Sequence, residues 1–252
     1  GWDFQGQDLT AANLNSADLT GANLSDAVIA NTDLGQTTDR GFTESMLRST
    51  RSYQTGDLSG VVLTDNDLRG WDLSGLTLTG ADFDDSTMER VDLRGSVLID
   101  AEFPSVPLAG ANLAGADLTG ARLTGADLRN ADFTDAVVRD AELSRVTDEG
   151  FTAEQLYSTA SYQQVDLGGI GLAANALNGW QLPGMRMAEA DLSFTELFDA
   201  NLAQSDLTNS TLRSANAGAA RFDGADLDCV DLRFASLAGA SLRGIYLGNA
   251  AL

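Results

Sequence analysis

The chain has 252 residues, of which 43% are apolar, and it carries 37 acidic side chains against 15 basic ones, for a net charge of −22. It contains no histidine, no lysine and one cysteine, Cys229, which excludes imidazole-based catalysis, Ser-His-Asp triads, His or Cys zinc sites and disulfide frameworks. No apolar run approaches the length of a membrane span, and arginines scattered among more numerous acids predict no direct nucleic-acid binding.

A five-residue repeat runs through almost the whole chain. Leu, Phe or a substitute recurs at every fifth position over 4–34, 58–143 and 167–252, which gives 7, 18 and 18 units. The residue two before each centre is usually Ala or another small residue, and the residue just before it is usually Asp or Asn. A period of five fits neither an α-helix nor a β-strand, so it predicts a chain that turns a corner every five residues.

We expect four such five-residue sides to close one square coil. On each side the central Leu and the small residue two before it point inward, and the other three positions face solvent. Neighbouring coils then pair their backbones about 4.8 Å apart. The sequence therefore predicts an all-β solenoid, a quadrilateral parallel β-helix whose core is a stack of Leu ladders.

Tandem units such as Ala116-Asp117-Leu118-Thr119-Gly120 resemble the pentapeptide-repeat proteins. The resemblance covers 43 units and implies that the β-helix is right-handed. It says little about function, because one fold hosts many roles.

Two interruptions break the repeat within one continuous domain. Repeats are expected over 2–35, 56–144 and 165–252, and helical interruptions over 36–55 and 145–164. The interruptions match each other at a constant offset, as Thr38 matches Thr147, which predicts a longer module with a super-repeat period of 109. The chain begins just inside one module and stops where a third interruption would start. Either it is a fragment of a longer array or the natural protein ends there, and we favour the fragment.

Each interruption is expected to hold one short helix, over 43–50 and over 152–159. Thr152 is a helix N-cap, and Gln155 three residues later completes a capping box. Two-turn helices are too short to persist alone, so Leu47 and Leu156 should pack against the solenoid. We expect nine extra residues in each interruption, which would put both helices on one face of the rod. The competing count of four extra residues would put them on adjacent faces.

Aromatic residues mark the same junctions. Trp71 and Trp180 stand at the normally small inward position, and we expect them to pack on the helices. Tyr53 and Tyr162 keep the five-residue frame and are expected at centre positions as the coil resumes. Under an alternative interpretation Trp71, Trp180, Leu47 and Leu156 form a docking site for a partner, but we favour module junctions, because duplication of a stable module produces the same pattern.

The acidic side chains are the only candidate ligands for a metal ion. Because every fourth unit returns to the same face, Asp72, Asp92, Asn112 and Asp132 should form a column there. The copies one module later are Gln181, Asn201, Arg221 and Ser241. Because the column is not kept and a flat ladder does not converge on one ion, we expect no metal site and no cofactor.

Two hypotheses of function remain. The first is a non-catalytic structural or protein-interaction module of a larger bacterial repeat protein, with an unknown protein partner, because no acid pair, nucleophile or cofactor loop departs from the repeat. The second follows from the resemblance: some pentapeptide-repeat proteins mimic duplex DNA and bind type II topoisomerases such as gyrase. A rod roughly 55–60 Å long with this net charge carries about 0.4 charges per Å, against about 0.6 for DNA.

The last expectations concern setting and assembly. The junction signatures Gly41-Phe42-Thr43 and Gly70-Trp71 resemble interrupted arrays in large secreted or surface bacterial proteins, so an exported or cell-surface location is expected. The final coil, 237–252, ends in plain repeat. Its unpaired backbone edge should recruit a second copy end to end.

Overall fold

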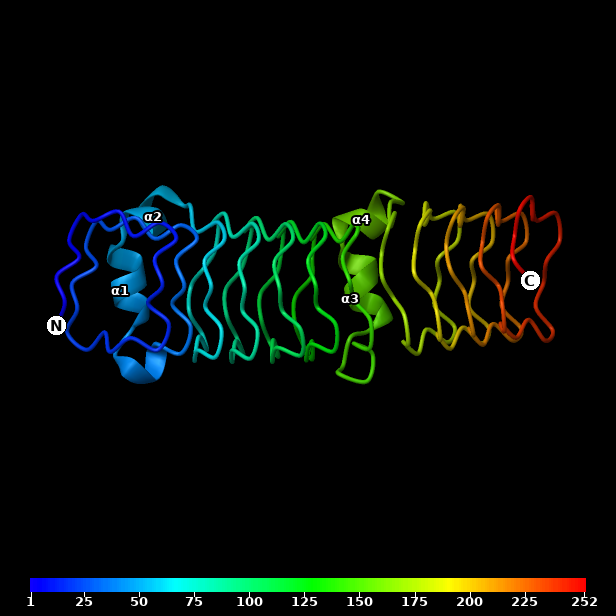
Figure 1. Ribbon diagram of the computed structural model, residues 1–252. Helices are drawn as coiled ribbons and strands as arrows, with labels where there is room; N and C mark the ends of the chain where they lie inside the picture. Colours follow the sequence, from blue (N-terminus) through cyan, green and yellow to red (C-terminus); the bar gives the residue numbers. More distant parts are fainter.

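The computed structural model describes all 252 residues, which form a long rod of stacked square coils (Figure 1). Each side of a coil forms a one-residue parallel bridge with the equivalent side of the next coil, as Asp72 does with Asp92. The right-handed quadrilateral β-helix expected from the repeat is confirmed.

The four faces of the rod are called A to D in chain order. In three successive coils their central residues are Leu73, Leu93 and Leu113 on face A, Leu78, Leu98 and Leu118 on face B, Leu63, Phe83 and Phe103 on face C, and Leu68, Met88 and Leu108 on face D. Faces A and C lie opposite each other, because each side follows the last around a square.

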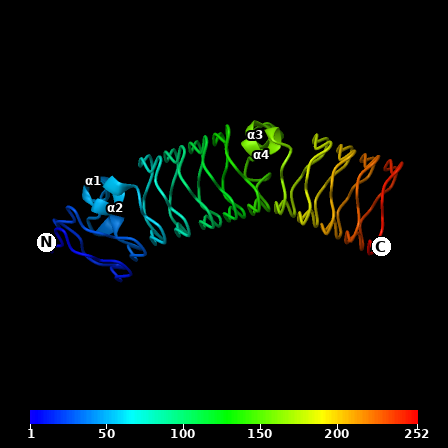
Figure 2. The ribbon, with the colours of Figure 1, turned by 90° about the horizontal axis from the view of Figure 1, so that it is seen from above.

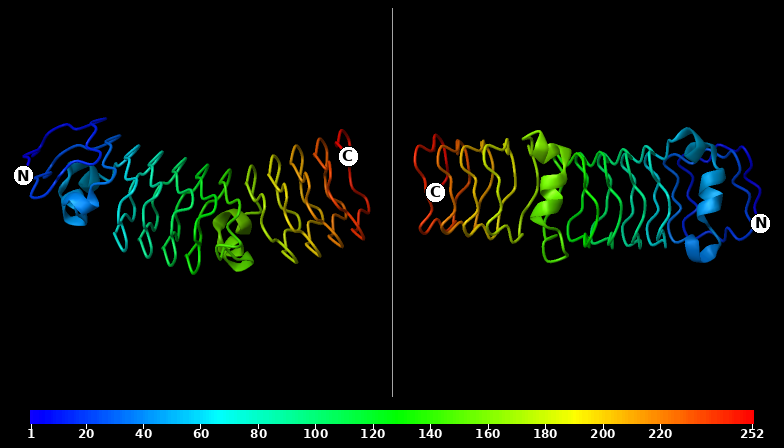
Figure 3. Two further views of the ribbon diagram at one scale, coloured as in Figure 1. Left: turned by 60° about the horizontal axis from the view of Figure 1, so that its bottom comes forward. Right: turned by 180° about the vertical axis from the view of Figure 1, so that it is seen from behind.

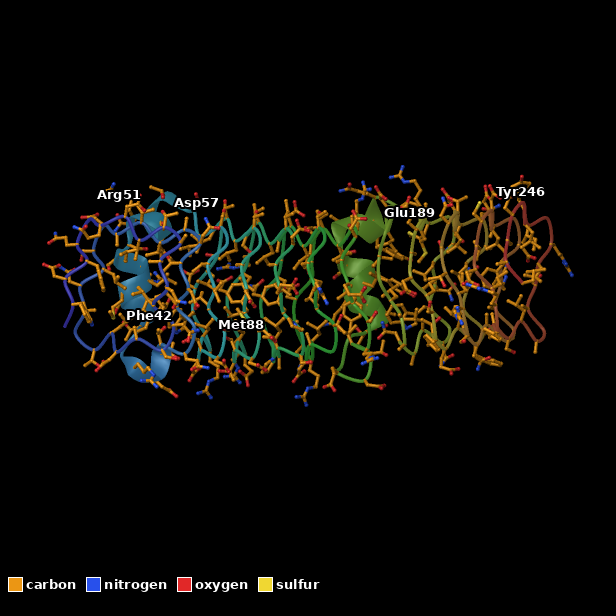
Figure 4. All side chains as sticks on the ribbon, viewed as in Figure 1. Phe42, Arg51, Asp57, Met88, Glu189 and Tyr246 are labelled. Atoms are coloured by element: carbon orange, nitrogen blue, oxygen red, sulfur yellow. The ribbon has the colours of Figure 1, made fainter.

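The core is one continuous column inside the coils. Leu118 and the small residue two positions before it, Ala116, are both fully buried, and so is Met88 (Figure 4). On face C the rings of Phe83 and Phe103 stack 4.9 Å apart. A single cluster of 65 buried apolar residues runs along the rod from Leu19 to Leu232.

Each junction adds nine residues to one coil. Asp33 pairs with Val62 and Glu142 pairs with Gly171, in both cases nine positions beyond the partner that an uninterrupted coil would supply. The count of nine extra residues is therefore correct, and both helical insertions lie on the same side of the rod (Figures 1 and 3). Face C is the only face whose ladder of bridges passes through both junctions.

Each insertion forms two short α-helices, preceded in the first junction by a 3-10 helix, which corrects the expectation of one helix. The bounds are η1 Thr38–Arg40, α1 Glu44–Ser49 and α2 Arg51–Thr55 in the first junction, and α3 Ala153–Ser158 and α4 Ala160–Gln163 in the second. Thr43 and Thr152 are the N-caps, and the capping box with Gln155 is present. Thr50 and Thr159 have extended ψ angles that end the first helix, and their hydroxyls cap the next one. The chain therefore turns a corner of the coil between the two helices.

The expectation for Tyr53 and Tyr162 was wrong. Both residues lie in the second helix of their junction, not at an inward centre position. Both are partly exposed, and each hydroxyl reaches across to the next coil. The five-residue count failed here because a helix of 3.6 residues per turn does not preserve the frame.

The rod is bent, with α3 and α4 on the convex side (Figure 2). A helix is about 10 Å wide, whereas coils stack about 4.8 Å apart. The first helix of each junction replaces a strand on face A, while face C keeps its ordinary pairing. The inserted helix therefore acts as a wedge on one side of the stack.

The chain adopts positive φ where it returns from the second helix of each junction to the coil, and in the second junction this residue carries a branched side chain. Val165 has φ +59°, and its counterpart one module earlier is Gly56, with φ +80°. Left-handed backbone is unfavourable for β-branched residues. We expect Val165→Gly to raise the free energy of unfolding by about 1 kcal/mol.

The reverse change, Gly56→Val, should lower the free energy of unfolding by about 1–2 kcal/mol. No atom lies within 4 Å of a Cβ built at Gly56, so backbone strain is the only cost. Chemical denaturation of both variants checks the pair. A destabilised Val165→Gly would show that the valine side chain contributes packing that outweighs the strain.

Candidate functional site

The acidic residue before each centre has a local structural role. Oδ1 of Asp117 accepts the backbone N–H of Thr119 at 3.1 Å and its hydroxyl at 2.6 Å. Such a bond closes the turn at the corner and competes well with water. The same bond to the residue two positions on is made by Asp8, Asp18, Asp57, Asp67, Asp72, Asp82, Asp92, Asp127, Asp132, Asp191, Asp206, Asp226 and Asp231. Much of the negative charge is therefore a consequence of how the repeat turns.

Four of the seven arginines that directly follow a centre pair with the acid of their own repeat. Arg69 lies 2.5 Å from Asp67, and Arg94, Arg129 and Arg233 make the same pair with the acid two positions before. These pairs are exposed, so each stabilises the fold by only about 0–1 kcal/mol. Together with those of Arg48, Arg122, Arg139 and Arg186, ion pairs account for eight of the 15 arginines.

Two of these ion pairs predict a pH dependence. The guanidinium groups of Arg69 and Arg233 hold the pKa of Asp67 and Asp231 at about 2, below the ordinary 3.8. A carboxylate with a lowered pKa in the folded state stabilises the fold above its unfolded pKa and loses that contribution as pH falls toward the folded value. We therefore expect the melting temperature to fall between pH 4 and pH 2.

Thermal unfolding followed by circular dichroism at pH 5, 4, 3 and 2 measures this effect. The variant Asp67→Asn/Asp231→Asn serves as the control, since it should melt lower at pH 5 and show a shallower decline. Equal slopes for the two proteins would mean that other groups set the acid sensitivity.

The acidic column lies where the sequence placed it, on face A. Asp72 is paired with Asp92, and Asn112 with Asp132. Each carboxylate accepts hydrogen bonds from nearby groups. Asp72 accepts them from Ser74 and Arg48, Asp92 from Arg94, and Asp132 from Thr134. These hydrogen bonds lower the pKa of all three acids. No group of three or more acids or Cys is arranged to hold a metal ion.

The four candidate interaction residues lie inside the junctions. Leu47 and Leu156 are fully buried, and Trp71 and Trp180 are 9% and 8% exposed. Phe42, which lies beside α1 in Figure 4, contacts the ring of Trp71 with the ring centres 5.8 Å apart. A partner at a junction would therefore meet the outer surfaces of the helices and not these side chains.

The helices on face A interrupt the ladder, and side chains replace the lost backbone partners. Asp72 donates its N–H to Glu44 at 3.1 Å, and its carbonyl accepts the Tyr53 hydroxyl at 2.9 Å. One module later the Tyr157 hydroxyl accepts the N–H of Gln181, and the Tyr162 hydroxyl donates to the carbonyl of Gln181. The tyrosines therefore protect a sheet edge that would otherwise be open.

Two buried asparagines, which the sequence analysis did not single out, hold the chain where it leaves the coil. Asn66 is 2% exposed and accepts the N–H groups of Thr37 and Thr38, both at 2.9 Å. It also donates to the carbonyl of Leu34. Asn175 makes the equivalent bonds in the second junction. An Asn at the small inward position, repeated in the equivalent place of both modules, is the signal that would have identified them.

Exposed large apolar side chains gather near the C-terminal end. Leu242, Leu247 and Leu252 are 36%, 38% and 83% exposed. They surround the open end of the core, an apolar hollow of about 200 Å³. The residues that line it are Phe222, Leu227, Leu232, Leu237, Leu242, Ile245, Leu247 and Leu252. The coil edge is also unpaired, because the backbone N–H groups of Leu237, Leu242 and Leu247 donate no hydrogen bond.

Comparison with known proteins supports the repeat. The family model described as pentapeptide repeats matches in eight copies, at residues 3–38, 57–105, 108–147, 181–213, 190–228 and 205–244. No curated protein sequence matches the chain. None of the helices is long and apolar enough to cross a membrane.

Three solved structures are similar to this chain. HetL, a pentapeptide-repeat protein involved in heterocyst differentiation regulation in the cyanobacterium Nostoc, is 24% identical over 99% of this chain and 88% of its own, with a TM-score of 0.42. Full-length QnrB1, a plasmid-mediated fluoroquinolone resistance protein, is 15% identical over 95% and 91%, with a TM-score of 0.32. Rfr23 from the cyanobacterium Cyanothece is 16% identical over 78% and 95%, with a TM-score of 0.21.

At such low scores these neighbours indicate nothing about what this chain binds. The family model is the stronger finding, because its matches cover most of the chain and coincide with the square coils. The chain belongs to the pentapeptide-repeat family.

Proposed function

We propose that this chain is a non-catalytic rod that serves as a structural and protein-interaction module, and that its C-terminal coil associates end to end with a second copy. The observation that carries the non-catalytic role is that the carboxylates before the centres close turns, and the end-to-end contact is proposed for the 252-residue chain by itself. Unpaired N–H groups and an exposed Leu ladder lie at one surface, which is the combination that recruits another strand.

The polar groups of the coils support a non-catalytic role. The carboxylates before the centres close turns, and the arginines beside them neutralise the same carboxylates. Neither set leaves a group aimed at a shared point where a substrate would react. The surface is therefore suited to contact and not to chemistry.

Sedimentation velocity at tens of micromolar protein tests the end-to-end contact. We expect association to increase with protein concentration and with salt, because salt screens the repulsion between two acidic rods. Leu242→Glu/Leu247→Glu should abolish it, whereas Tyr246→Ser, on the outer surface of the same coil (Figure 4), should not. A monomer at low and high salt would contradict the proposal.

DNA mimicry is the second candidate, and charge density favours it. About twelve coils at about 4.8 Å and a net charge of −22 give a linear charge about two thirds of that of duplex DNA. A gyrase supercoiling assay tests it directly, with inhibition expected at micromolar protein. Unchanged supercoiling at that concentration would contradict mimicry and leave the end-to-end contact untouched.

We also propose an exported or cell-surface setting. The support is the resemblance of the junction signatures to interrupted arrays in secreted or surface bacterial proteins. Fractionation of the source cells with an antibody to the chain tests the location, and recovery only from the cytosol would contradict it.

A further inference from the structure

Three phenylalanines are exposed on one side of the C-terminal module. Phe194, Phe198 and Phe234 are 62%, 57% and 77% exposed. Phe194 and Phe234 occupy the same corner between faces C and D, two coils apart and thus about 10 Å along the rod. Phe198 stands beside the centre of face D in the coil of Phe194. We call these three residues the aromatic face; they lie in the yellow-to-orange part of the rod (Figure 1).

The fold does not require these rings. Their counterparts one module earlier are Asp85, Glu89 and Gly125, in coils of the same geometry. Phe194 and Phe234 also have positive φ angles of +59° and +64°, a region that bulky residues rarely adopt. Both the backbone and the exposure to water disfavour phenylalanine at these corners, so the aromatic side chains call for an explanation other than stability.

The surface between the three Phe rings is formed mainly by small residues and carries little charge. Phe198 lies over Gly218, where a Cβ atom would come within 3.4 Å of its ring. The side-chain amide of Asn216 donates a hydrogen bond to the Glu196 carboxylate at 2.7 Å. The acid nearest the centre of the aromatic face is therefore hydrogen-bonded to a neighbouring side chain. In the first module the matching surface carries Asp127 and Arg129, where the second has Ser236 and Ala238.

One cation borders the aromatic face. The guanidinium of Arg213 lies 5.3 Å from the centre of the Phe234 ring, which is a cation–π contact. Beyond it the surface returns to the acidic repeat, with Asp191 and Asp199 on either side of face D. The aromatic face is therefore an apolar island in a strongly negative field.

A second copy is a poor occupant for this island. The three rings expose on the order of 400 Å², about half of the roughly 800 Å² per partner that a stable interface buries. Two copies meeting here would also bring acidic surroundings against acidic surroundings. A partner must gain the rest of its contact from the surrounding carboxylates, and only a basic partner does so.

We propose that the aromatic face binds a basic protein segment that carries apolar side chains on one side, such as an amphipathic helix rich in Lys or Arg. The negative rod attracts the segment, and its apolar side chains pack between Phe194, Phe198 and Phe234. This surface is separate from the C-terminal edge, so it adds a lateral contact to the end-to-end one.

Fluorescence anisotropy tests the proposal with a labelled synthetic helix that has Leu on one face and Lys on the other. Phe194→Ser/Phe198→Ser/Phe234→Ser leaves the charge unchanged, and we expect it to weaken binding at least tenfold. A peptide with Ser in place of Leu should bind the wild-type protein at least tenfold more weakly, and salt should weaken all binding.

Matched variants isolate the surface. Asp85→Ser/Glu89→Ser alters the same positions in the first module and should change the affinity less than threefold. Leu242→Glu/Leu247→Glu should keep peptide binding, so failure of the end-to-end contact and failure of this proposal are distinguishable. Melting curves verify that the triple variant is folded, and it should melt no lower than the wild type.

Two outcomes would overturn the proposal. One is equal affinity of the wild-type protein and the triple Phe variant for the Leu/Lys helix, which would make binding purely electrostatic. The other is a concentration-dependent dimer of the wild-type protein that the triple variant loses while the variant at the C-terminal edge keeps it, which would show that the occupant is a second copy.

Discussion

Leu118→Asp is expected to unfold the coils around it, at a cost of more than about 4 kcal/mol. The side chain is fully buried in the Leu ladder of face B, and an unpaired carboxylate there has no partner. Asp117→Ala, one residue earlier, should cost only about 1 kcal/mol, because it removes the turn-closing bonds from Thr119.

Thermal and urea unfolding of the two variants measure the contrast. Leu118→Met is the conservative control and should cost less than about 1.5 kcal/mol, and Asp117→Asn should keep most of the turn, since its amide oxygen still accepts. Similar melting temperatures for Leu118→Asp and Asp117→Ala would contradict the assignment of inward and outward positions.

Asn66→Ala is expected to destabilise the first junction by about 2–4 kcal/mol. The change leaves the N–H groups of Thr37 and Thr38 and the carbonyl of Leu34 without their partner. Each buried polar group left unpaired costs about 1–3 kcal/mol, and water entering the vacated space recovers part of that.

Two further variants sharpen this prediction. Asn66→Asp keeps the acceptor for Thr37 and Thr38 but loses the donor to Leu34, and it buries a charge, so it should also destabilise. Asn175→Ala should cost at least as much as Asn66→Ala, because Asn175 makes the equivalent bonds and also donates to the carbonyl of Leu172. Urea unfolding gives the values, and a loss below about 0.5 kcal/mol at both sites would mean that water replaces the amide.

The square coil could be predicted from the sequence alone. Inward and outward positions follow from a five-residue pattern that each side satisfies with its own residues and its immediate neighbours, as Ala116 and Leu118 do. Local regularity of this kind needs no knowledge of distant contacts. The nine extra residues and the common face of both insertions followed from the same arithmetic, because whole coils return to the same face.

The sequence also identified the junction residues but not their contacts. Trp71 and Trp180 were placed against the insertions, and they pack there. Their burial followed from the mismatch between an indole and the small inward position. The corner between the two helices was not foreseen, because Thr50 and Thr159 are equally compatible with a helix interior until the turn of the coil is known.

The groups that satisfy the backbone where the repeat stops could be found only in the folded chain. Tyr53 reaches Asp72 across 19 residues and Asn66 reaches Leu34 across 32, and no local pattern specifies such distances. The exposure of Phe194, Phe198 and Phe234 likewise depends on which corner each residue occupies in the assembled rod. A repeat specifies the contacts that it makes with its own copies, whereas contacts between unlike segments arise only when the fold brings those segments together.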